Sequence, residues 1–198
     1  MRQNHNGLAT GVDHAAVQRA ATDLLRALGR DVDYDEALAE TPRRVADAYV
    51  ELLDKRPFRP TTFPNDDGYD ELILARSIPF HSLCEHHLLP FHGVAHVGYL
   101  PGERIIGLSK LGRVVEYFSR DLQIQERLTT QVAGWLQREL EPKGVGVVLE
   151  AEHLCMSLRG VQKLGAKTVT SALRGAVRDD ARTRQEFLAL TTRTSHEQ

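Results

Sequence analysis

The stretch SKLGRVVEYFSRDLQIQERLTTQVAGWLQREL, residues 109–140, contains two amphipathic helix patterns in direct succession. Apolar residues recur at helical spacing over residues 111–118, where Ser109 is placed to cap the helix, and again over residues 128–140. Two helices in succession do not fit the strictly alternating order of a doubly wound parallel sheet. This stretch therefore decides which class of α and β protein the chain belongs to.

Pairs of predicted strands flank the two helices. Residues 72–80 and 94–100 precede the helices, and residues 145–151 and 167–172 follow them, all rich in residues that favour strands. Strands and helices that come in pairs favour an α+β fold with an antiparallel sheet. We therefore predict the core order strand, strand, helix, helix, strand, strand (ββααββ).

The N-terminal part of the chain has a different pattern. After a polar start, Asp13 and Thr41-Pro42 are placed to begin two helices, and a proline-rich connector ends at Gly68. We expect residues 1–68 to form an N-terminal tail and helical region. Residues 69–198 would form the domain that carries the sheet, and the two parts would act as one functional unit.

The composition excludes several classes of protein. The 198 residues are 41% hydrophobic and 26% charged, with a formal net charge of -2. This length can bury the core of one domain, but the charge does not fit a general nucleic-acid binder. The chain lacks an apolar stretch of the roughly 20 residues that span a bilayer, and its start does not resemble a signal peptide. We expect a cytoplasmic protein with neither nucleic acid nor membrane as a partner.

Both cysteines of the chain lie next to histidines. Cys84-Glu85-His86-His87 has the spacing Cys-x-x-His, and His153-Leu154-Cys155 has the spacing His-x-Cys. Zinc prefers thiolate and imidazole ligands in a tetrahedral arrangement. The pattern predicts a zinc site in which one turn presents Cys84 and His87 and the fold brings Cys155 to them. The ordinary alternative is a pair of buried, apolar cysteines.

The spacing leaves two kinds of zinc site open. A structural site fills all four positions with protein, and one further histidine beside Cys84, His87 and Cys155 could complete it. A catalytic site leaves one position for a water molecule, whose pKa zinc lowers to about 7. In that case His86 and His153 would be available for acid–base chemistry.

Basic side chains suggest a phosphorylated ligand. Ser109, Lys110 and Arg113 lie at a predicted helix N-terminus, where free backbone N–H groups favour an anion, and Arg159 follows the second cysteine. Such convergence in a nearly neutral chain fits a small phosphorylated molecule better than a polymer. The alternative is a solvated helix start.

Glu126 and Gln125 lie between the two predicted helices. A carboxylate can accept two N–H bonds from a guanine-type edge, so this pair could recognise a purine. The alternative is a glutamate that simply stabilises a helix start through the helix dipole.

Taken together, these segments resemble GTP cyclohydrolase I. The resemblance runs from about residue 13 to residue 190, and the matching runs are residues 41–46, 82–91, 96–101, 106–110, 123–129, 150–156 and 159–161. It implies a tunnelling fold, in which the antiparallel ββααββ unit with N-terminal helices assembles into an oligomeric barrel. Such proteins are usually homodecamers with active sites between subunits.

The resemblance implies an activity and a cofactor. GTP would be hydrolysed to 7,8-dihydroneopterin triphosphate and formate, the first step of folate and pterin biosynthesis. Zinc, held by Cys84, His87 and Cys155, would activate the water that attacks C8 of the guanine. The ribose carbons would then rearrange and close the new ring.

The resemblance also implies roles for side chains around the metal. His153 would protonate the imidazole-ring nitrogen as that ring opens, and His86, with Ser109, would assist opening of the ribose. Substrate-binding residues would be Glu126 and Gln125 at the guanine edge, with Arg44, Lys110, Arg113 and Arg159 around the triphosphate.

The chain departs from the family pattern at a few positions. Residues 35–38 read Asp-Glu-Ala-Leu where Arg-Glu-Gly-Leu is frequent, Asp121 stands where arginine is common, and Arg174 replaces a usual aliphatic residue. None of these changes removes a proposed catalytic group. Two alternatives are a deazaguanine nitrile reductase, which relies on a nucleophilic cysteine without the zinc pair, and a binding module with structural zinc.

Overall fold

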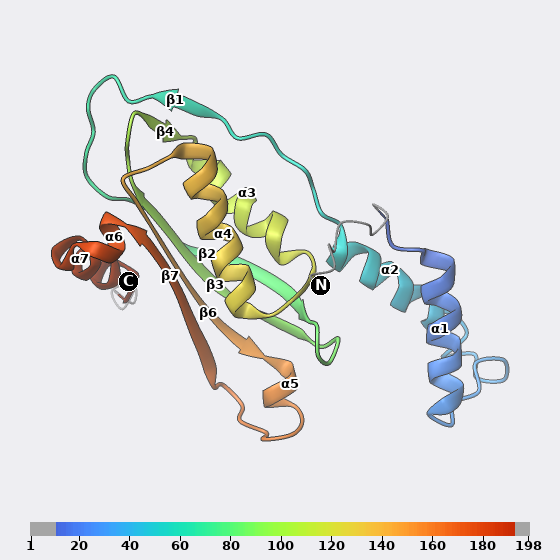
Figure 1. The fold of residues 1–198 in the computed structure, drawn as a ribbon. Helices are drawn as coiled ribbons and strands as arrows, with labels where there is room; N and C mark the ends of the chain where they lie inside the picture. The colour runs from blue at the N-terminus through green and yellow to red at the C-terminus, as the bar shows by residue number, and fades with distance from the viewer. Residues whose placement is uncertain (1–10, 193–198) are drawn as a thin grey trace, which may run out of the picture. The chain divides into compact units, whose positions relative to one another are not determined.

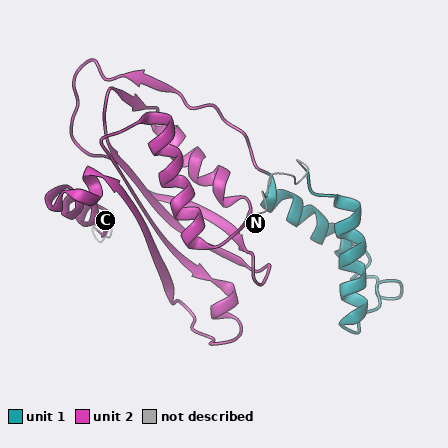
Figure 2. Ribbon diagram, viewed as in Figure 1, with its two compact units in different colours: residues 1–54 teal, residues 55–198 magenta. Residues whose placement is uncertain are grey.

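The chain forms two compact units, residues 1–54 and residues 55–198 (Figure 2). The computed structural model describes residues 11–192, so most of the expected N-terminal tail lies outside the described residues. The two units meet between residues 54 and 55, so the boundary expected after residue 68 lies within the second unit. Strand β1 (Thr62–Pro64) pairs antiparallel with β4 (Arg104–Ile106), which attaches the connector to the unit that carries the large sheet.

The first unit contains the two expected helices, α1 (His14–Ala27) and α2 (Thr41–Leu53). The Asp13 carboxylate accepts a hydrogen bond from the backbone N–H of Ala16 at 2.9 Å, which confirms the predicted cap of α1. The cap predicted for α2 is wrong by one residue. Thr41 is already helical, and Glu40 occupies the cap position without a side-chain hydrogen bond to a backbone N–H of the first turn. Its carboxylate accepts a hydrogen bond from the Arg43 side chain at 2.7 Å instead.

The second unit is built on a five-stranded sheet with strand order β5-β2-β3-β6-β7 (Figure 1). Its strands are β2 (Ile73–Cys84), β3 (Pro90–Leu100), β5 (Leu122–Gln123), β6 (Gly144–His153) and β7 (Lys167–Gly175). The four long strands pair antiparallel, so the predicted α+β class is confirmed. The sheet is nevertheless mixed, because β5 pairs parallel with the end of β2.

Helices α3 (Leu108–Ser119) and α4 (Gln125–Leu140) cover one face of the sheet (Figure 1). Their apolar faces pack on inward-facing strand residues, and Leu111, Leu136 and Val147 are fully buried there. The cap predicted at Ser109 is wrong, because Ser109 is already the second residue of the helix. Gly107 takes the cap position and accepts a hydrogen bond from the N–H of Lys110 at 2.8 Å.

The opposite face of the sheet is covered by α6 (Ala176–Asp179) and α7 (Ala181–Thr192). Successive strand residues point to opposite faces, so Val147 joins the main core and Val148 packs with the fully buried Phe187 of α7. Asp180 accepts a hydrogen bond from the N–H of Thr183 at 2.7 Å, which satisfies a free donor in the first turn of α7. Among the described residues, none of the helices is both long and apolar enough to cross a membrane.

Candidate metal centre

Cys84 and His87 are presented by the turn between β2 and β3. The Cys84 N–H donates to the carbonyl of Leu89 at 2.9 Å, and the Leu88 N–H donates to the carbonyl of Cys84 at 2.8 Å. Leu88 adopts a φ of 56°, a left-handed conformation that closes the turn. This tight geometry holds two potential ligands three residues apart on the same turn.

Cys155 reaches the same place from the far end of β6. Strand β6 pairs with β3 so that His153 lies opposite Phe91, close to the turn, and the one-turn helix α5 (Leu154–Ser157) begins directly afterwards. The Cys155 Sγ atom lies 4.0 Å from the Cys84 Sγ atom, and both cysteines are buried. The register of two antiparallel strands therefore assembles ligands that are distant in sequence.

The three side chains fit a zinc ion. The potential ligand atoms of Cys84, His87 and Cys155 all lie within 4.8 Å of one another. Tetrahedral zinc, with Zn–S near 2.3 Å and Zn–N near 2.0–2.1 Å, places two sulfurs about 3.8 Å apart and a sulfur and a nitrogen about 3.6 Å apart. The observed separations are 4.0 Å between the two sulfurs and 3.7 Å between Cys84 Sγ and His87 Nδ1.

The ionisation of Cys155 depends on whether a cation lies beside it. Burial, followed by the neighbouring Cys84 thiol, raises the pKa of Cys155. A divalent cation favours the thiolate form of a coordinating cysteine and would offset both effects. In the part of the chain that the structure describes, the group of possible ligands consists of these three residues.

His153 is held in one orientation beside this centre. Its Nε2 lies 2.8 Å from the side-chain oxygen of Gln125, and its ring stacks on Phe91 with 4.5 Å between the centroids. An amide oxygen can only accept, so Nε2 carries the proton and Nδ1 is the acceptor of the neutral imidazole. Burial lowers the pKa of His153, and the nearby Glu126 carboxylate partly opposes this.

Gln125 was expected at the edge of a guanine, and the structure gives its amide other neighbours. The side chain is only 2% exposed. Its Nε2 donates to the carbonyls of Leu149 and Thr168 and to Thr170 Oγ1, while its oxygen contacts His153. Glu126, the next residue, is exposed and lines a groove of about 500 Å³ along α4, together with Arg138 of that helix and Arg174 of β7.

Two other predicted site residues lie next to the ligands. Arg159 Nη1 donates to His87 Nε2 at 3.2 Å, and the Nδ1 atom of His86 lies 4.0 Å from Cys84 Sγ. Arg44 has an exposed side chain on α2 in the first unit, and its role stays a prediction.

Ser109, Lys110 and Arg113 lie on the first turns of α3, away from the ligands of their own chain. The start of α3 is tied to the C-terminal end of β3 by the hydrogen bond from the Ile106 N–H to Tyr99 Oη at 3.0 Å. The ligand turn lies at the N-terminal end of the same strand, which begins at Pro90. At about 3.3 Å per residue these two ends are about 30 Å apart.

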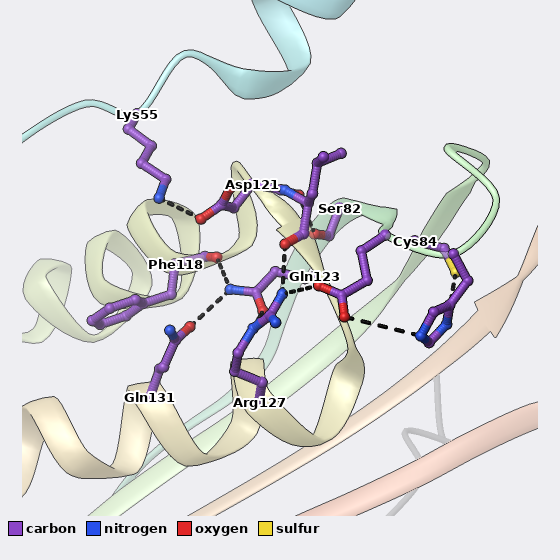
Figure 3. Close-up of polar contacts among 11 residues, drawn as sticks. Lys55, Ser82, Cys84, Phe118, Asp121, Gln123, Arg127 and Gln131 are labelled. Atoms are coloured by element: carbon purple, nitrogen blue, oxygen red, sulfur yellow. Dashed lines mark hydrogen bonds and ion pairs between the residues drawn. The ribbon is translucent and has the colours of Figure 1, made fainter. Parts of the chain in front are cut away.

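A network of polar side chains beside the ligand turn was not predicted (Figure 3). Glu85 of the turn contacts Arg127 of α4, and Arg127 in turn contacts the buried Gln123 of β5. Gln123 and Arg127 lie four residues apart in sequence. That spacing alone does not predict their contact with the ligand turn, which depends on the parallel pairing of β5 with β2.

Fold and site together define a class: an α+β protein whose candidate metal centre has two cysteines and one histidine, flanked by two further histidines and an arginine. The sequence model of the family described as GTP cyclohydrolase I matches residues 17–192. The chain belongs to the GTP cyclohydrolase I family.

Individual relatives agree with this assignment. The chain is 52% identical over 197 residues to GTP cyclohydrolase 1 of Mycobacteroides abscessus, covering 96% of each chain. It is 51% identical over 179 residues to GTP cyclohydrolase 1 of Aquifex aeolicus, covering 90% of this chain and 97% of the relative. The chain is thus an enzyme of a family that hydrolyses GTP for pterin and folate biosynthesis. This membership does not fit the alternatives of a nitrile reductase or a non-enzymatic module.

Among solved structures, the chain is similar to archaeosine synthase QueF-Like in the apo form. The likeness has a TM-score of 0.41 and 16% sequence identity, and it covers 52% of this chain and 93% of the other. A TM-score this low does not establish a common fold.

Proposed function

We propose that the chain hydrolyses GTP to 7,8-dihydroneopterin triphosphate and formate at a zinc centre held by Cys84, His87 and Cys155. The observation that carries this proposal is the approach of these three ligand atoms to within 4.8 Å of one another, with the oriented His153 two residues from Cys155. When bound, zinc would act as a Lewis acid and make a water molecule reactive near neutral pH.

His153 is suited to move the proton that ring opening requires. Its Nε2 proton is held by Gln125, which leaves Nδ1 as the atom that exchanges a proton. Nδ1 would take a proton and deliver it to the imidazole-ring nitrogen of guanine as the bond from C8 to that nitrogen breaks. His86, next to Cys84 and largely exposed, would assist opening of the ribose together with Ser109.

Glu126 would hold the guanine edge. Its carboxylate is exposed at the first turn of α4, and Gln125 beside it fixes His153. The triphosphate would be bound by the basic side chains Arg44, Lys110, Arg113 and Arg159.

The active site would be shared between subunits. Ser109, Lys110 and Arg113 lie near the opposite end of β3 from the ligand turn, so a second copy of the chain would have to bring them to the metal. Strand β7 is an edge of the sheet, and Val161 and Leu164, between Cys155 and that edge, are exposed apolar residues. Both features favour a homo-oligomer, and we propose a tunnelling-fold barrel, a decamer, in the cytoplasm.

Incubation of the purified protein with GTP tests the activity. Formate should be released, and oxidation of the products should yield a fluorescent pterin. Removal of the metal with a chelator should stop both, and added zinc should restore them. Absence of product from protein that demonstrably contains zinc would overturn the proposal.

Substitution of the ligands and of His153 separates their roles. Cys155→Ser should weaken zinc binding more than about 100-fold, since changes to outer-shell partners alone cost up to that amount. His153→Asn should abolish product formation while zinc stays bound, measured by metal analysis of the purified protein. Loss of zinc from His153→Asn would instead identify His153 as a ligand.

A further inference from the structure

Arg127 connects the ligand turn to the helix that carries the proposed guanine-binding residue. Its Nη2 lies 2.5 Å from Glu85 Oε2 and 2.6 Å from the carbonyl of Leu122, and its Nε donates to Gln123 Oε1 at 2.8 Å. Glu85 stands between the ligands Cys84 and His87 in sequence, and Arg127 follows Glu126. The contact therefore joins the two halves of the proposed site.

Two acceptors of the Arg127 guanidinium belong to strand β5, and one of them, Gln123, is buried and held by further hydrogen bonds (Figure 3). Gln123 is only 1% exposed, and its Nε2 donates to the carbonyl of Phe118 at 2.9 Å and to Gln131 Oε1 at 2.7 Å. A planar guanidinium that is bonded to Gln123 and to the backbone of Leu122 has little freedom to turn. Its orientation is set by β5 and α3 rather than by solvent.

The ligand turn is attached to the same strand through its backbone. The Glu85 N–H donates to the carbonyl of Gln123 at 3.1 Å, and Cys84 lies opposite Gln123 in the parallel pairing of β2 and β5. The second carboxylate oxygen of Glu85 lies 3.9 Å from His86 Nε2. Glu85 thus faces Arg127 with one oxygen and His86 with the other.

We propose that Glu85 and Arg127 are positioning residues that clamp the Cys84–His87 turn against the N-terminus of α4. The Glu85–Arg127 clamp orients the metal ligands and fixes the distance between the metal and Glu126. Neither residue is assigned to metal or substrate. The effect on catalysis rests on the proposed function, whereas the effect on metal binding does not.

The expected consequences differ from those of an ordinary surface ion pair. The Arg127 and Glu85 side chains are 40% and 32% exposed, and a pair of this exposure adds little to global stability. Loss of the clamp should therefore appear in metal binding and catalysis, while unfolding changes little. A merely structural ion pair would show no such separation.

The experiment compares Glu85→Gln and Arg127→Gln with the matched control Glu116→Gln. Glu116 forms an ion pair with Arg120 at 3.0 Å, with side-chain exposures of 36% for the glutamate and 12% for the arginine, and both residues belong to the α3 region. Metal affinity is measured by competition with a chelator, and the ligand geometry by the absorption spectrum of the cobalt-substituted protein. Urea unfolding and the separate values of kcat and KM for GTP complete the comparison.

Each clamp variant should bind zinc roughly tenfold more weakly, at the lower end of the range for the loss of residues that orient metal ligands without binding the metal. Its cobalt spectrum should change, and kcat should fall more than KM rises. Glu116→Gln should match the parent protein in all of these. The double variant should lose no more metal affinity and no more kcat than the more affected single variant, because the two residues act as one unit.

Unchanged metal affinity and an unchanged cobalt spectrum in Glu85→Gln would overturn the clamp. Glutamine has nearly the same shape as glutamate, so Glu85→Gln tests the clamp even if Arg127→Gln folds poorly. A parent protein that binds metal but does not hydrolyse GTP would overturn the proposed function alone, since the metal readouts still test the clamp.

Discussion

At the scale of single residues, Gln125 shows how one side chain can serve the fold and the site together. Its amide nitrogen donates to acceptors on β6 and β7 and its amide oxygen accepts a hydrogen bond from His153, so orienting the histidine depends on the packing of α4 over the sheet. The predicted part of Gln125 in holding the substrate stays a prediction.

Replacing Gln125 by leucine should therefore affect stability and activity at once. The carbonyls of Leu149 and Thr168 would lose a buried donor, which should cost about 1–3 kcal/mol in the free energy of unfolding. The kcat for GTP should also fall because His153 is no longer held. Urea unfolding and steady-state kinetics measure the two effects, with Gln137→Leu on the same helix as the control. Parental stability of Gln125→Leu would contradict the prediction.

His96 should make stability depend on pH. It is 8% exposed, and its Nδ1 accepts a hydrogen bond from the Ser77 N–H. Burial, followed by the charge of Arg76, lowers the pKa of His96, and Glu150 partly opposes this. The unfolded chain, with a histidine pKa near 6.5, binds the proton more readily than the folded chain does. Stability should therefore fall as the pH drops below about 6.5.

The variant His96→Asn isolates this contribution, because asparagine keeps an acceptor but does not titrate. The slope of stability against pH from this one group cannot exceed about 1.4 kcal/mol per pH unit. Urea unfolding of the parent and of His96→Asn at several pH values should show a smaller slope for the variant. Equal slopes would exclude a role of His96.

At the scale of elements, helix α7 packs on the sheet at a position where two neighbouring glycines leave space. Gly98 of β3 and Gly146 of β6 are register partners, and the fully buried Phe187 lies over them. A Cβ atom at Gly146 would lie 2.7 Å from atoms of the Phe187 ring. The missing side chains create the space in which the C-terminal helix packs.

Gly146→Ala should destabilise the protein by about 1–3 kcal/mol, as overpacked cores usually do. Combining it with Phe187→Leu, which makes room, should cost less than the sum of the two single changes. Thermal or urea unfolding of the four proteins measures this coupling. Strict additivity would show that Phe187 and Gly146 do not share the space.

At the scale of the whole molecule, the proposed site is incomplete within one chain. The ligand turn and the start of α3 lie near opposite ends of β3, although both carry residues assigned to the same reaction. We propose that contact between copies brings them together. The substrate-binding residues of one copy would then complete the metal centre of another.

Mixing two inactive variants should restore activity. Lys110→Ala removes a proposed triphosphate contact, and Cys155→Ser removes a proposed metal ligand. A shared site can then take its metal ligands from the Lys110→Ala copy and its lysine from the Cys155→Ser copy, so that all the residues it needs are present. Activity should reappear after the two proteins are dissociated and reassembled together, but not when each is reassembled alone. Light scattering should show a mass several times that of one chain. A monomer, or persistent inactivity of the mixture, would contradict shared sites.

The sequence by itself determined the α+β class, the four helices α1 to α4 and the identity of the candidate ligands. Hydrophobic periodicity is a local property, and cysteines next to histidines stand out whatever the fold. The predicted strands over residues 72–80 and 94–100 are too short, because β2 and β3 continue through polar residues to Cys84 and from Pro90. The alternation of apolar and polar side chains is lost near the candidate metal centre, so hydrophobic periodicity does not predict the strand residues there.

Only the tertiary structure decided the contacts between segments that are distant in sequence. The parallel pairing of the two-residue β5, the stack of His153 on Phe91 and the contact of Glu85 with Arg127 all arise from strand register and helix packing. None has a periodic signal, because each depends on where two separate stretches of backbone meet. The tertiary structure likewise separated Ser109 from the ligands of its own chain, since the length of β3 lies between them.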